Sequence, residues 1–381
     1  MSLQAHSFTI GVEEEYQVID PETRELSQST QLILPEAQKT LGENVQHEMI
    51  LSQIEIATPV CHSLAEVQEE LIRLRGGVIT AADHVDKKIA AAGTHAFSQW
   101  SEQTVTPKER YISLIETYQQ MIREQVIFGC HVHIGVPDPE IAIQILNHAR
   151  VWLSPIIALT ANSPFWLGAD TGYQDYRTGL WWTVPLAGPP PPFTSYADYR
   201  QTIDNMIETE SIDDATKIYW DLRPSERFPT LEFRVMDVAM TLEEAVMMAG
   251  LIRGLVHTCY DHVMRKIPCP DFTTDQLRVM HWRAARYGLS ERLIDIQARR
   301  SMPARECINN MLEFIRPALE VEGDWPLVAN SVQRILNEGN GAERQQRVYQ
   351  STGDFRALVD YIVAETRNFP QPTRILTHQA V

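Results

Sequence analysis

The sequence lacks the cysteine spacing of a disulfide framework or a structural zinc site. Its five cysteines (Cys61, Cys130, Cys259, Cys269 and Cys307) are scattered, odd in number and include no C-x-x-C pair. Disulfide scaffolds are small, secreted and dense in cysteine, whereas the cytosol keeps thiols reduced. We therefore expect free thiols and a cytoplasmic location.

Basic runs, a leader segment and long apolar runs are also missing. The 381 residues carry 33 Lys and Arg against 50 Asp and Glu, a net charge of −17, without any Lys/Arg-rich stretch. Nucleic-acid binders usually carry a basic patch. We find no signal peptide before residue 8 and no apolar run long enough for a bilayer. We expect neither nucleic-acid nor membrane partners, while the acidic balance permits cation binding.

What the chain does have is length and apolar content, because 44% of its residues are hydrophobic. That is ample for a large core. Strand-like and helical segments alternate as far as about residue 270, and only helical periodicity follows from 273, broken at Pro303, Pro317 and 339–341. We predict an α+β fold, with helices outside a mainly antiparallel sheet. The range 1–381 is expected to be one catalytic domain, with a helical C-terminal third at roughly 270–381.

Individual elements follow from local patterns. We predict strands at 8–20, 45–58, 126–136, 217–224 and 230–238. We predict helices at 63–92, 106–124, 138–162, 196–209 and 241–265. The capping box Ser63–Glu66 begins the first helix, and Pro107 stands at the first position of the second. The segment 164–195 is predicted to be irregular because it ends in the run 188–192, Gly-Pro-Pro-Pro-Pro.

The run FTIGVEEEYQVID at residues 8–20 places three glutamates inside a predicted strand, where glutamate is rare. Side chains two apart share a face of a strand. Glu13 and Glu15 therefore lie together, with Glu14 on the opposite face.

Four other predicted strands show polar residues at the same spacing. They are His131 with His133, Glu232 with Arg234, Glu55 with Gln53, and Tyr219 with Asp221 and Arg223. Unpaired buried carboxylates are costly, and a divalent cation is an effective compensation. Carboxylates with an occasional imidazole suit Mg²⁺ or Mn²⁺. The pattern predicts metal ligands at Glu13, Glu15, Glu55, His133 and Glu232, and leaves His131 open.

Each element taken alone has a simpler interpretation. A glutamate run often protects a sheet edge, H-x-H is a weak signal, and Glu232 with Arg234 is also consistent with an ion pair. In each of these strands the polar residues share one face and the other face is apolar. This recurrence favours the metal site.

Seven stretches resemble the carboxylate–amine ligases of the second glutamate–cysteine ligase family. They are FTIGVEEEYQVID, LSQIEIATPVC, GTHAFSQW, FGCHVHIGVPD, RTGLWWTVPLAGPPPPF, IYWDLRPSERFPTLEFRVMD and EEAVMMAGLIRGL. They occur in order from about residue 8 to at least 290. The resemblance implies a fold like that of glutamine synthetase, in which a curved antiparallel sheet forms a funnel with helices outside. ATP and metals enter one side and the acid substrate the other.

The resemblance also implies residue roles. Glu13 and Glu15 look like a pair that bears one ion each, and Glu55 matches a position that faces metal. Arg234 is the implied catalytic and cofactor-binding arginine that meets phosphate, and Arg223 a second catalytic arginine. Arg177 is a cofactor-binding candidate on a loop, running through Trp182, that closes over the acid substrate.

The implied reaction is ATP-dependent joining of the carboxylate of glutamate, through an acyl phosphate, to an amine such as cysteine. Weak glutamate–cysteine ligase activity fits this reaction, with ATP and Mg²⁺ or Mn²⁺ as cofactors. No stretch fixes the amine. The expected partners are small molecules (glutamate, an amine or amino acid, and ATP), and a homo-oligomer is possible. The alternatives are a phosphotransferase of the guanidino-kinase kind, an ATP-independent metallohydrolase on the same cluster, and a binding protein with a degenerate site.

Overall fold

A seven-stranded sheet forms the centre of the protein, whose computed structural model describes residues 8–369. The strands follow the order β2 (Val45–His47), β3 (Gln53–Ala57), β1 (Ile10–Ile19), β5 (Gly129–Gly135), β9 (Thr230–Asp237) and β8 (Leu222–Pro224), and β4 (Lys88–Ala90) also pairs with β1. All of these pairings are antiparallel. The predicted α+β fold with a mainly antiparallel sheet is confirmed.

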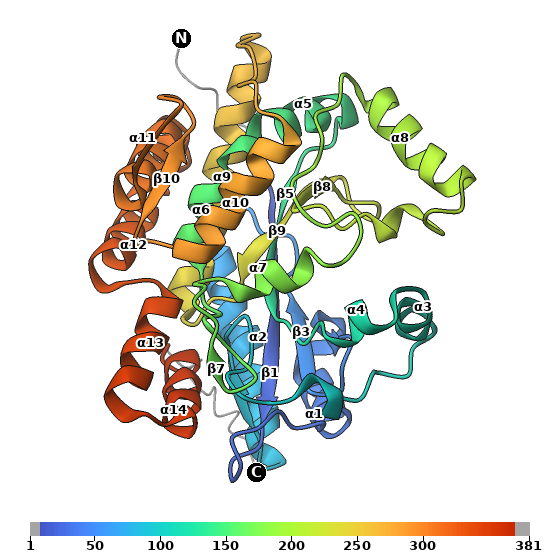
Figure 1. Cartoon of the computed structure of the whole chain (residues 1–381), viewed down its shortest axis with the longest axis vertical. Helices are drawn as coiled ribbons and strands as arrows, with labels where there is room; N and C mark the ends of the chain where they lie inside the picture. Colours follow the sequence, from blue (N-terminus) through green and yellow to red (C-terminus); the bar gives the residue numbers. More distant parts are fainter. Residues whose placement is uncertain (1–7, 370–381) are drawn as a thin grey trace, which may run out of the picture.

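Helices surround this sheet on most sides (Figure 1). Those before residue 270 are α1 (Thr30–Leu41), α2 (Leu64–His84), α3 (Glu109–Tyr118), α4 (Gln120–Arg123), α5 (Pro139–Ala149), α6 (Leu153–Thr160), α7 (Tyr176–Trp181), α8 (Tyr196–Glu208) and α9 (Leu242–Met264). The C-terminal helices are α10 (Thr274–Tyr287), α11 (Ala304–Glu322), α12 (Trp325–Glu338), α13 (Gly341–Thr352) and α14 (Phe355–Thr366). In Figure 1, α11–α14 line the left side, and α3, α4 and α8 lie on the right.

Strand β1 shows how the sheet separates its two faces. Val12, Glu14 and Tyr16 are buried on the face that α2 covers, while Glu13 and Glu15 lie on the other face and are partly exposed. The buried Glu14 is not isolated, because Arg75 of α2 approaches its carboxylate to 2.5 Å. The middle glutamate of the run therefore stabilises the fold, and its two neighbours face the open side.

Several predicted boundaries are wrong in the N-terminal half. The helix predicted at 63–92 ends at His84, and the chain turns through Asp86 (φ 54°) into β4, because pairing with β1 outweighs the continuing apolar pattern. The helix predicted at 106–124 begins only at Glu109 and is divided at Gln119 (φ 50°). Helix α1 has no counterpart among the predicted elements, and it contains Pro35.

Other differences lie in the second half. The strand predicted at 217–224 is reduced to β8, and the segment 164–195 contains α7 together with the short hairpin β6 (Phe165–Trp166) and β7 (Ala169–Asp170). A hairpin of β10 (Arg292–Asp295) and β11 (Arg300–Pro303) interrupts the helical third. Pro317 does not end its helix, because α11 continues to Glu322 on a strongly amphipathic pattern.

One stretch is more apolar than we expected. Within the described residues, Pro139–Thr160 is the one segment long and apolar enough to pass as a membrane span, with a mean hydropathy of 1.2. However, 89% of the apolar 18-residue window within this segment is buried inside the fold, as is common for core helices. All five cysteines are free, as expected, and four of them are buried.

Candidate active site

A row of polar side chains crosses the open face of the sheet, because the strand register aligns them. Glu15 pairs with Glu55 across β1 and β3, and Glu13 pairs with His131 across β1 and β5. The row continues where His133 pairs with Glu232, and Glu232 with Arg223. Residues distant in sequence therefore face one another, since directly opposed Cβ atoms lie about 5 Å apart.

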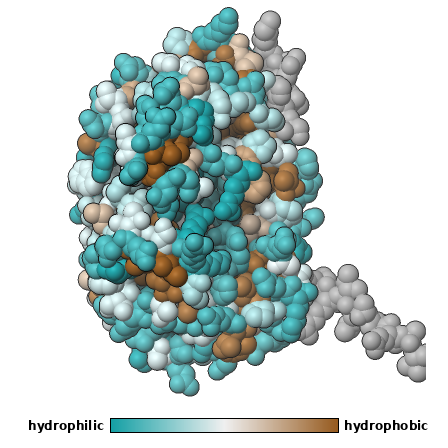
Figure 2. Space-filling view, turned by 90° about the vertical axis from the view of Figure 1, so that its right-hand side faces the viewer, coloured by the Kyte–Doolittle hydropathy of each residue, from teal (hydrophilic) through white to brown (hydrophobic). Residues whose placement is uncertain are grey.

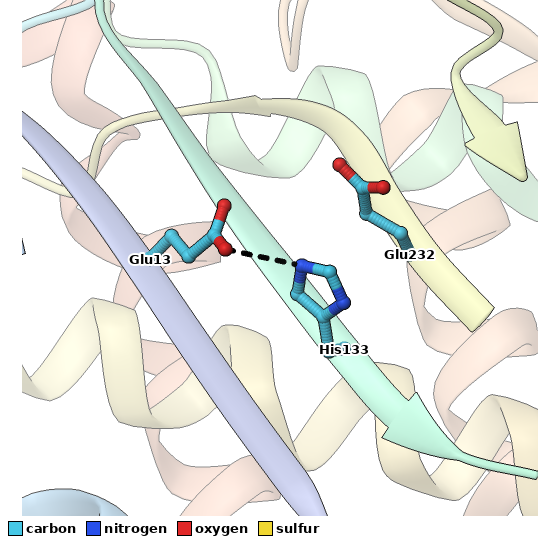
Figure 3. A group of neighbouring side chains, drawn as sticks. All are labelled: Glu13, His133 and Glu232. Carbon is cyan, nitrogen blue, oxygen red and sulfur yellow. Dashed lines mark ion pairs between the residues drawn. The ribbon is translucent and has the colours of Figure 1, made fainter. Parts of the chain in front are cut away.

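The first group in this row consists of Glu13, His133 and Glu232, from three adjacent strands (Figure 3). Each residue offers one possible ligand atom, and these atoms all lie within 4.8 Å of one another. Glu13 and Glu232 reach in from either side of the strand that carries His133. This spacing suits a single bound cation.

Hydrogen bonds orient the imidazole. Nδ1 of His133 lies 3.0 Å from Oγ1 of Thr230, and Nε2, which has no hydrogen bond, lies 3.4 Å from Oε1 of Glu13. A histidine whose Nδ1 is engaged in this way presents Nε2 as the ligand atom. Nδ1 of His131 lies 3.1 Å from Oε2 of the same glutamate, but His131 is not one of the candidate metal ligands.

Charges around the first group keep its carboxylates ionised. Burial alone raises the pKa of Glu13, but the imidazoles of His131 and His133 beside it outweigh burial and lower the pKa below its ordinary value. Burial likewise opposes ionisation of Glu232, and the nearby cations Arg234 and Arg223 hold its pKa well below the ordinary value. An ionised carboxylate is the form that a cation requires.

Two arginines flank Glu232. Nε of Arg223 donates a 2.8 Å hydrogen bond to one carboxylate oxygen, and Arg234 forms an ion pair with the other. Arg234 lies at a bulge, where Arg234 and Val235 of β9 together oppose the single residue His131 of β5. A bulge of this kind re-aims side chains near functional sites. The sequence prediction of an ion pair and that of a shared site are therefore compatible.

The second group consists of Glu15, Glu48 and Glu55, again with one carboxylate oxygen from each within 4.8 Å of the others. Burial and the charge of Glu48 raise the pKa of Glu15 to about 7. Burial and the neighbouring carboxylates raise the pKa of Glu55 well above its ordinary value. A divalent ion would relieve the mutual repulsion of these three acids.

Glu48 is the residue that our sequence reasoning missed. It follows β2, where Tyr111 of α3 donates a 2.8 Å hydrogen bond to its carboxylate. Glu48 stands two positions after Gln46, which faces Glu55 across the sheet and donates a 2.8 Å hydrogen bond to its carboxylate. The single strand predicted at 45–58 puts Glu48 an odd number of positions from Glu55, on the opposite face. The turn between β2 and β3 brings the two carboxylates to the same face, and the sequence pattern did not show that turn.

Both groups open into one outer cavity of about 340 Å³. Its mouth lies between the start of α3, at Lys108 and Arg110, and the turn 225–228 between β8 and β9. Figure 2 looks onto this side of the molecule and shows hydrophilic side chains around a hollow near its centre. Most of the side chains that line the cavity are charged, and they include both acids and arginines.

Two other predicted positions differ from expectation. Arg177 lies on α7, is 5% exposed and lines a smaller inner chamber behind Glu15, so it is not on an irregular loop over the mouth. Asp221 does not join Arg223 on the open face. It is buried beside His281, with Oδ2 3.2 Å from Nδ1, because the strand there begins only at Leu222.

The donor set fits hard divalent cations. It contains five carboxylates and one imidazole in two adjacent groups, with arginines beside them and no cysteine ligand. Oxygen-rich sites of this kind select Mg²⁺ or Mn²⁺, whereas thiolates select zinc. Five of the six candidate ligands lie on strands, which hold their side chains rigidly, and Glu48 comes from a loop.

Comparison with known families gives a match over almost the whole chain. The pattern of glutamate–cysteine ligase family 2 matches residues 9–361. A protein of Herpetosiphon aurantiacus is 42% identical over 359 residues, covering 94% of this chain and 93% of its own. One from Solibacter usitatus is 40% identical over 367 residues, covering 96% and 95%. Both carry provisional names as glutamate–cysteine ligase 2.

Solved structures give the same fold at low sequence identity. The glutamate–cysteine ligase of Francisella tularensis, in complex with AMP, has a TM-score of 0.73 at 12% identity, covering 98% of this chain and 91% of its own. A bifunctional glutathione synthetase from Pasteurella multocida has a TM-score of 0.69 at 14% identity, covering 94% of this chain and 52% of its own. These likenesses establish the predicted ligase fold.

Proposed function

The chain belongs to glutamate–cysteine ligase family 2, a family of carboxylate–amine ligases, and we propose that it couples ATP cleavage to amide-bond formation on glutamate. The carboxylate of glutamate, through its γ-carboxyl group, attacks the γ-phosphate of ATP and gives an acyl phosphate and ADP. An amine such as cysteine then attacks the acyl carbon, and phosphate and a proton leave. The free thiols and the use of ATP agree with a cytoplasmic location.

One observation supports this proposal above the others. The first and second groups of candidate metal ligands converge with two arginines at the base of one cavity. These residues come from five strands and a loop. Phosphoryl transfer needs little covalent chemistry from the protein and depends on positioning and charge neutralisation. The site supplies those two contributions.

The chain's residues have separate tasks in this scheme. Glu13, His133 and Glu232 would hold one Mg²⁺ or Mn²⁺, and Glu15, Glu48 and Glu55 another. If bound there, these ions would neutralise negative charge on the phosphate oxygens of ATP.

The arginines beside Glu232 serve the phosphoryl group. Arg234 is 15% exposed, so it can turn one face to a ligand while Glu232 anchors it. Arg223 is held on the other side by the same carboxylate and by backbone carbonyls at Thr216 and Ile218. A fixed guanidinium costs little reorganisation when charge develops, which is the condition for strong electrostatic stabilisation.

Phosphate release tests the proposal directly. We expect release from ATP, Mg²⁺ and glutamate to require an amine, with cysteine first in the panel. Amine-independent transfer to a stable phosphorylated product would support a phosphotransferase instead. Amide or phosphate-ester hydrolysis without any ATP binding would support a metallohydrolase.

The substitution Glu232→Gln gives a sharper test. It removes the charge that holds Arg223, Arg234 and one metal position, so we expect phosphate release to be abolished while the fold survives. Glu70→Gln is a matched control, because it removes a carboxylate paired with Arg73 on the outer surface of α2. Retained activity in Glu232→Gln argues against the assignment.

A further inference from the structure

Helices α3 and α4 (residues 109–123) form a cover over the inner chamber behind the second group, a space of about 100 Å³. Tyr111 and Leu114 of α3 and Ile122 of α4 line this chamber, and Tyr111 also lines the outer cavity. In Figure 1 the cover lies to the right of the sheet. The phosphoryl-transfer scheme gives the cover no role, although it borders both spaces.

The cover is attached to the fold separately from the main core. Its two helices pack mainly against each other, and Gln119, with φ 50°, breaks the chain between them. Its buried side chains belong to a small apolar cluster, distinct from the large core, whose buried members are Tyr111, Leu114, Ile122, Val184 and Tyr219. A segment with so few apolar contacts opens locally at a lower free-energy cost than global unfolding.

Tyr111 joins the cover to a candidate metal ligand. Its hydroxyl donates a 2.8 Å hydrogen bond to Oε2 of Glu48, and the carbonyl oxygen of His47 lies 3.5 Å from the same hydroxyl. The other side-chain hydrogen bonds formed by residues 109–123, all of them described, stay within 116–124. Tyr111 is 8% exposed, so water competes little for its bond to Glu48. A hydrogen bond to a carboxylate is also stronger than one between neutral groups.

We propose that Tyr111 is a positioning residue that links the second group of candidate metal ligands to the seating of the cover. Its hydroxyl orients the Glu48 carboxylate toward the other two acids of that group, and the same bond holds α3 over the inner chamber. This inference rests on the metal binding in the proposed function.

The link acts in both directions. When Glu48 is fixed as a ligand, it is also fixed as the acceptor for Tyr111, so the cover opens less often. When the cover is seated, Glu48 is held ready as a ligand, so metal affinity rises. Thermodynamic linkage makes the two effects equal as factors. A seated cover also excludes water, which would otherwise hydrolyse an acyl phosphate.

Hydrogen exchange of the whole protein, read by mass spectrometry in peptides from 109–123, measures how often the cover opens. We expect Mg²⁺ to slow exchange in these peptides by about tenfold, because hydrogen-bond partners of metal ligands commonly change metal affinity by at least that factor.

Tyr111→Phe removes the hydroxyl and keeps the ring in the apolar cluster, so the fold should survive. We expect Mg²⁺ to slow exchange in 109–123 by less than about twofold in this variant. Mn²⁺ should bind the second group about tenfold more weakly in titrations followed by electron paramagnetic resonance, with unchanged affinity at the first group.

Tyr118→Phe is the matched control. Tyr118 lies on the same helix and packs against the same apolar cluster, but its hydroxyl has no hydrogen-bond partner among the described residues. This variant should keep both the wild-type response to Mg²⁺ and the wild-type affinity for Mn²⁺.

Equal slowing by Mg²⁺ in Tyr111→Phe and in the wild-type protein overturns the inference. Exchange that is faster in Tyr111→Phe by one factor with and without Mg²⁺, at unchanged Mn²⁺ affinity, also overturns it, because a merely structural hydroxyl gives that result. If Mn²⁺ binds the second group of the wild-type protein and exchange in 109–123 is not slowed, the link fails and the ligase proposal stands. If no ion binds that group, the link and the metal assignment of the proposed function fail together.

Discussion

At the scale of single residues, the three consecutive glutamates have three different environments. Glu13 faces two histidines and stays ionised, while Glu15 faces other carboxylates and Gly129, whose N–H bonds it at 2.6 Å. Glu14 is buried against Arg75 on the opposite face. Glutamate thus contributes to both candidate metal groups and to the buried core. The alternation of side chains along the strand decides which of the two faces each glutamate joins.

The loop carboxylate Glu48 gives the first prediction at this scale. Glu48→Gln removes one of three acidic groups around the second candidate position, so we expect Mn²⁺ to bind there at least about tenfold more weakly. Titration followed by electron paramagnetic resonance measures it. Glu43→Gln is the control, because Glu43 is exposed on the preceding turn. Equal weakening in both variants would mean that Glu48 is not a ligand.

The pKa of Glu15 gives a second prediction. Burial and Glu48 raise this pKa to about 7, so a proton competes with the metal near neutral pH. Since the proton must leave before the ion binds, metal affinity should rise as pH increases through 7. Glu55 of the same group also has a raised pKa, so its proton competes with the ion as well. Mn²⁺ titrations at pH 6, 7 and 8 measure this rise, and a flat profile contradicts it.

At the scale of elements, the sheet register assembles the site and one helix fixes the sheet. Arg75 of α2 binds Glu14 on β1 and donates to the carbonyls of Ala239 and Met240, just before α9. One buried guanidinium therefore joins α2 to β1 and to the segment that leads into α9, behind the open face. The positions of Glu13 and Glu15 depend on this attachment.

Breaking that attachment should be costly. Arg75→Met leaves Glu14 buried and uncompensated, and we expect unfolding to become easier by about 3–5 kcal/mol. The double variant Glu14→Leu with Arg75→Met removes both charges and should recover much of the loss. Chemical denaturation measures the cycle. If the single and double variants are equally unstable, the loss lies in packing around Arg75 and not in the unpaired charge.

At the scale of the whole molecule, the fold separates a covered face from an open one. Helices α2, α6 and α9 contact the strands from one side, and the other side carries the acidic cavity. Glu15, Glu48 and Glu55 repel one another, which destabilises the folded chain, and a divalent ion would relieve this repulsion.

Ligand binding should therefore stabilise the whole protein. At Mg²⁺ concentrations about a hundred times the dissociation constant, mass action contributes about 2.7 kcal/mol. We expect the melting temperature to rise by a few degrees with Mg²⁺, and further with Mg²⁺ and ADP. NaCl at matched ionic strength is the control. An equal rise with NaCl indicates general screening and no specific site.

The sequence by itself determined which strand residues lie on the face of the sheet that carries the site. Glu13, Glu15, Glu55, His133 and Glu232 were predicted as one set, and the structure brings them together in two groups, because side chains two apart in a strand must share a face. The α+β class and the resemblance to a ligase family followed from local patterns and motifs. Whether these residues bind metal stays a prediction.

Only the tertiary structure decided which of these residues share a group and what lies behind them. Glu48 joins Glu15 and Glu55 from a loop, and Asp221 turns away to His281. The end of α2 and the hairpin at 292–303 also differ from local expectation. The hairpin is a local pairing of β10 with β11, which its sequence pattern did not indicate. Each of the other three depends on a partner far away in the sequence, and local periodicity carries no record of which distant strand or side chain will compete for a residue.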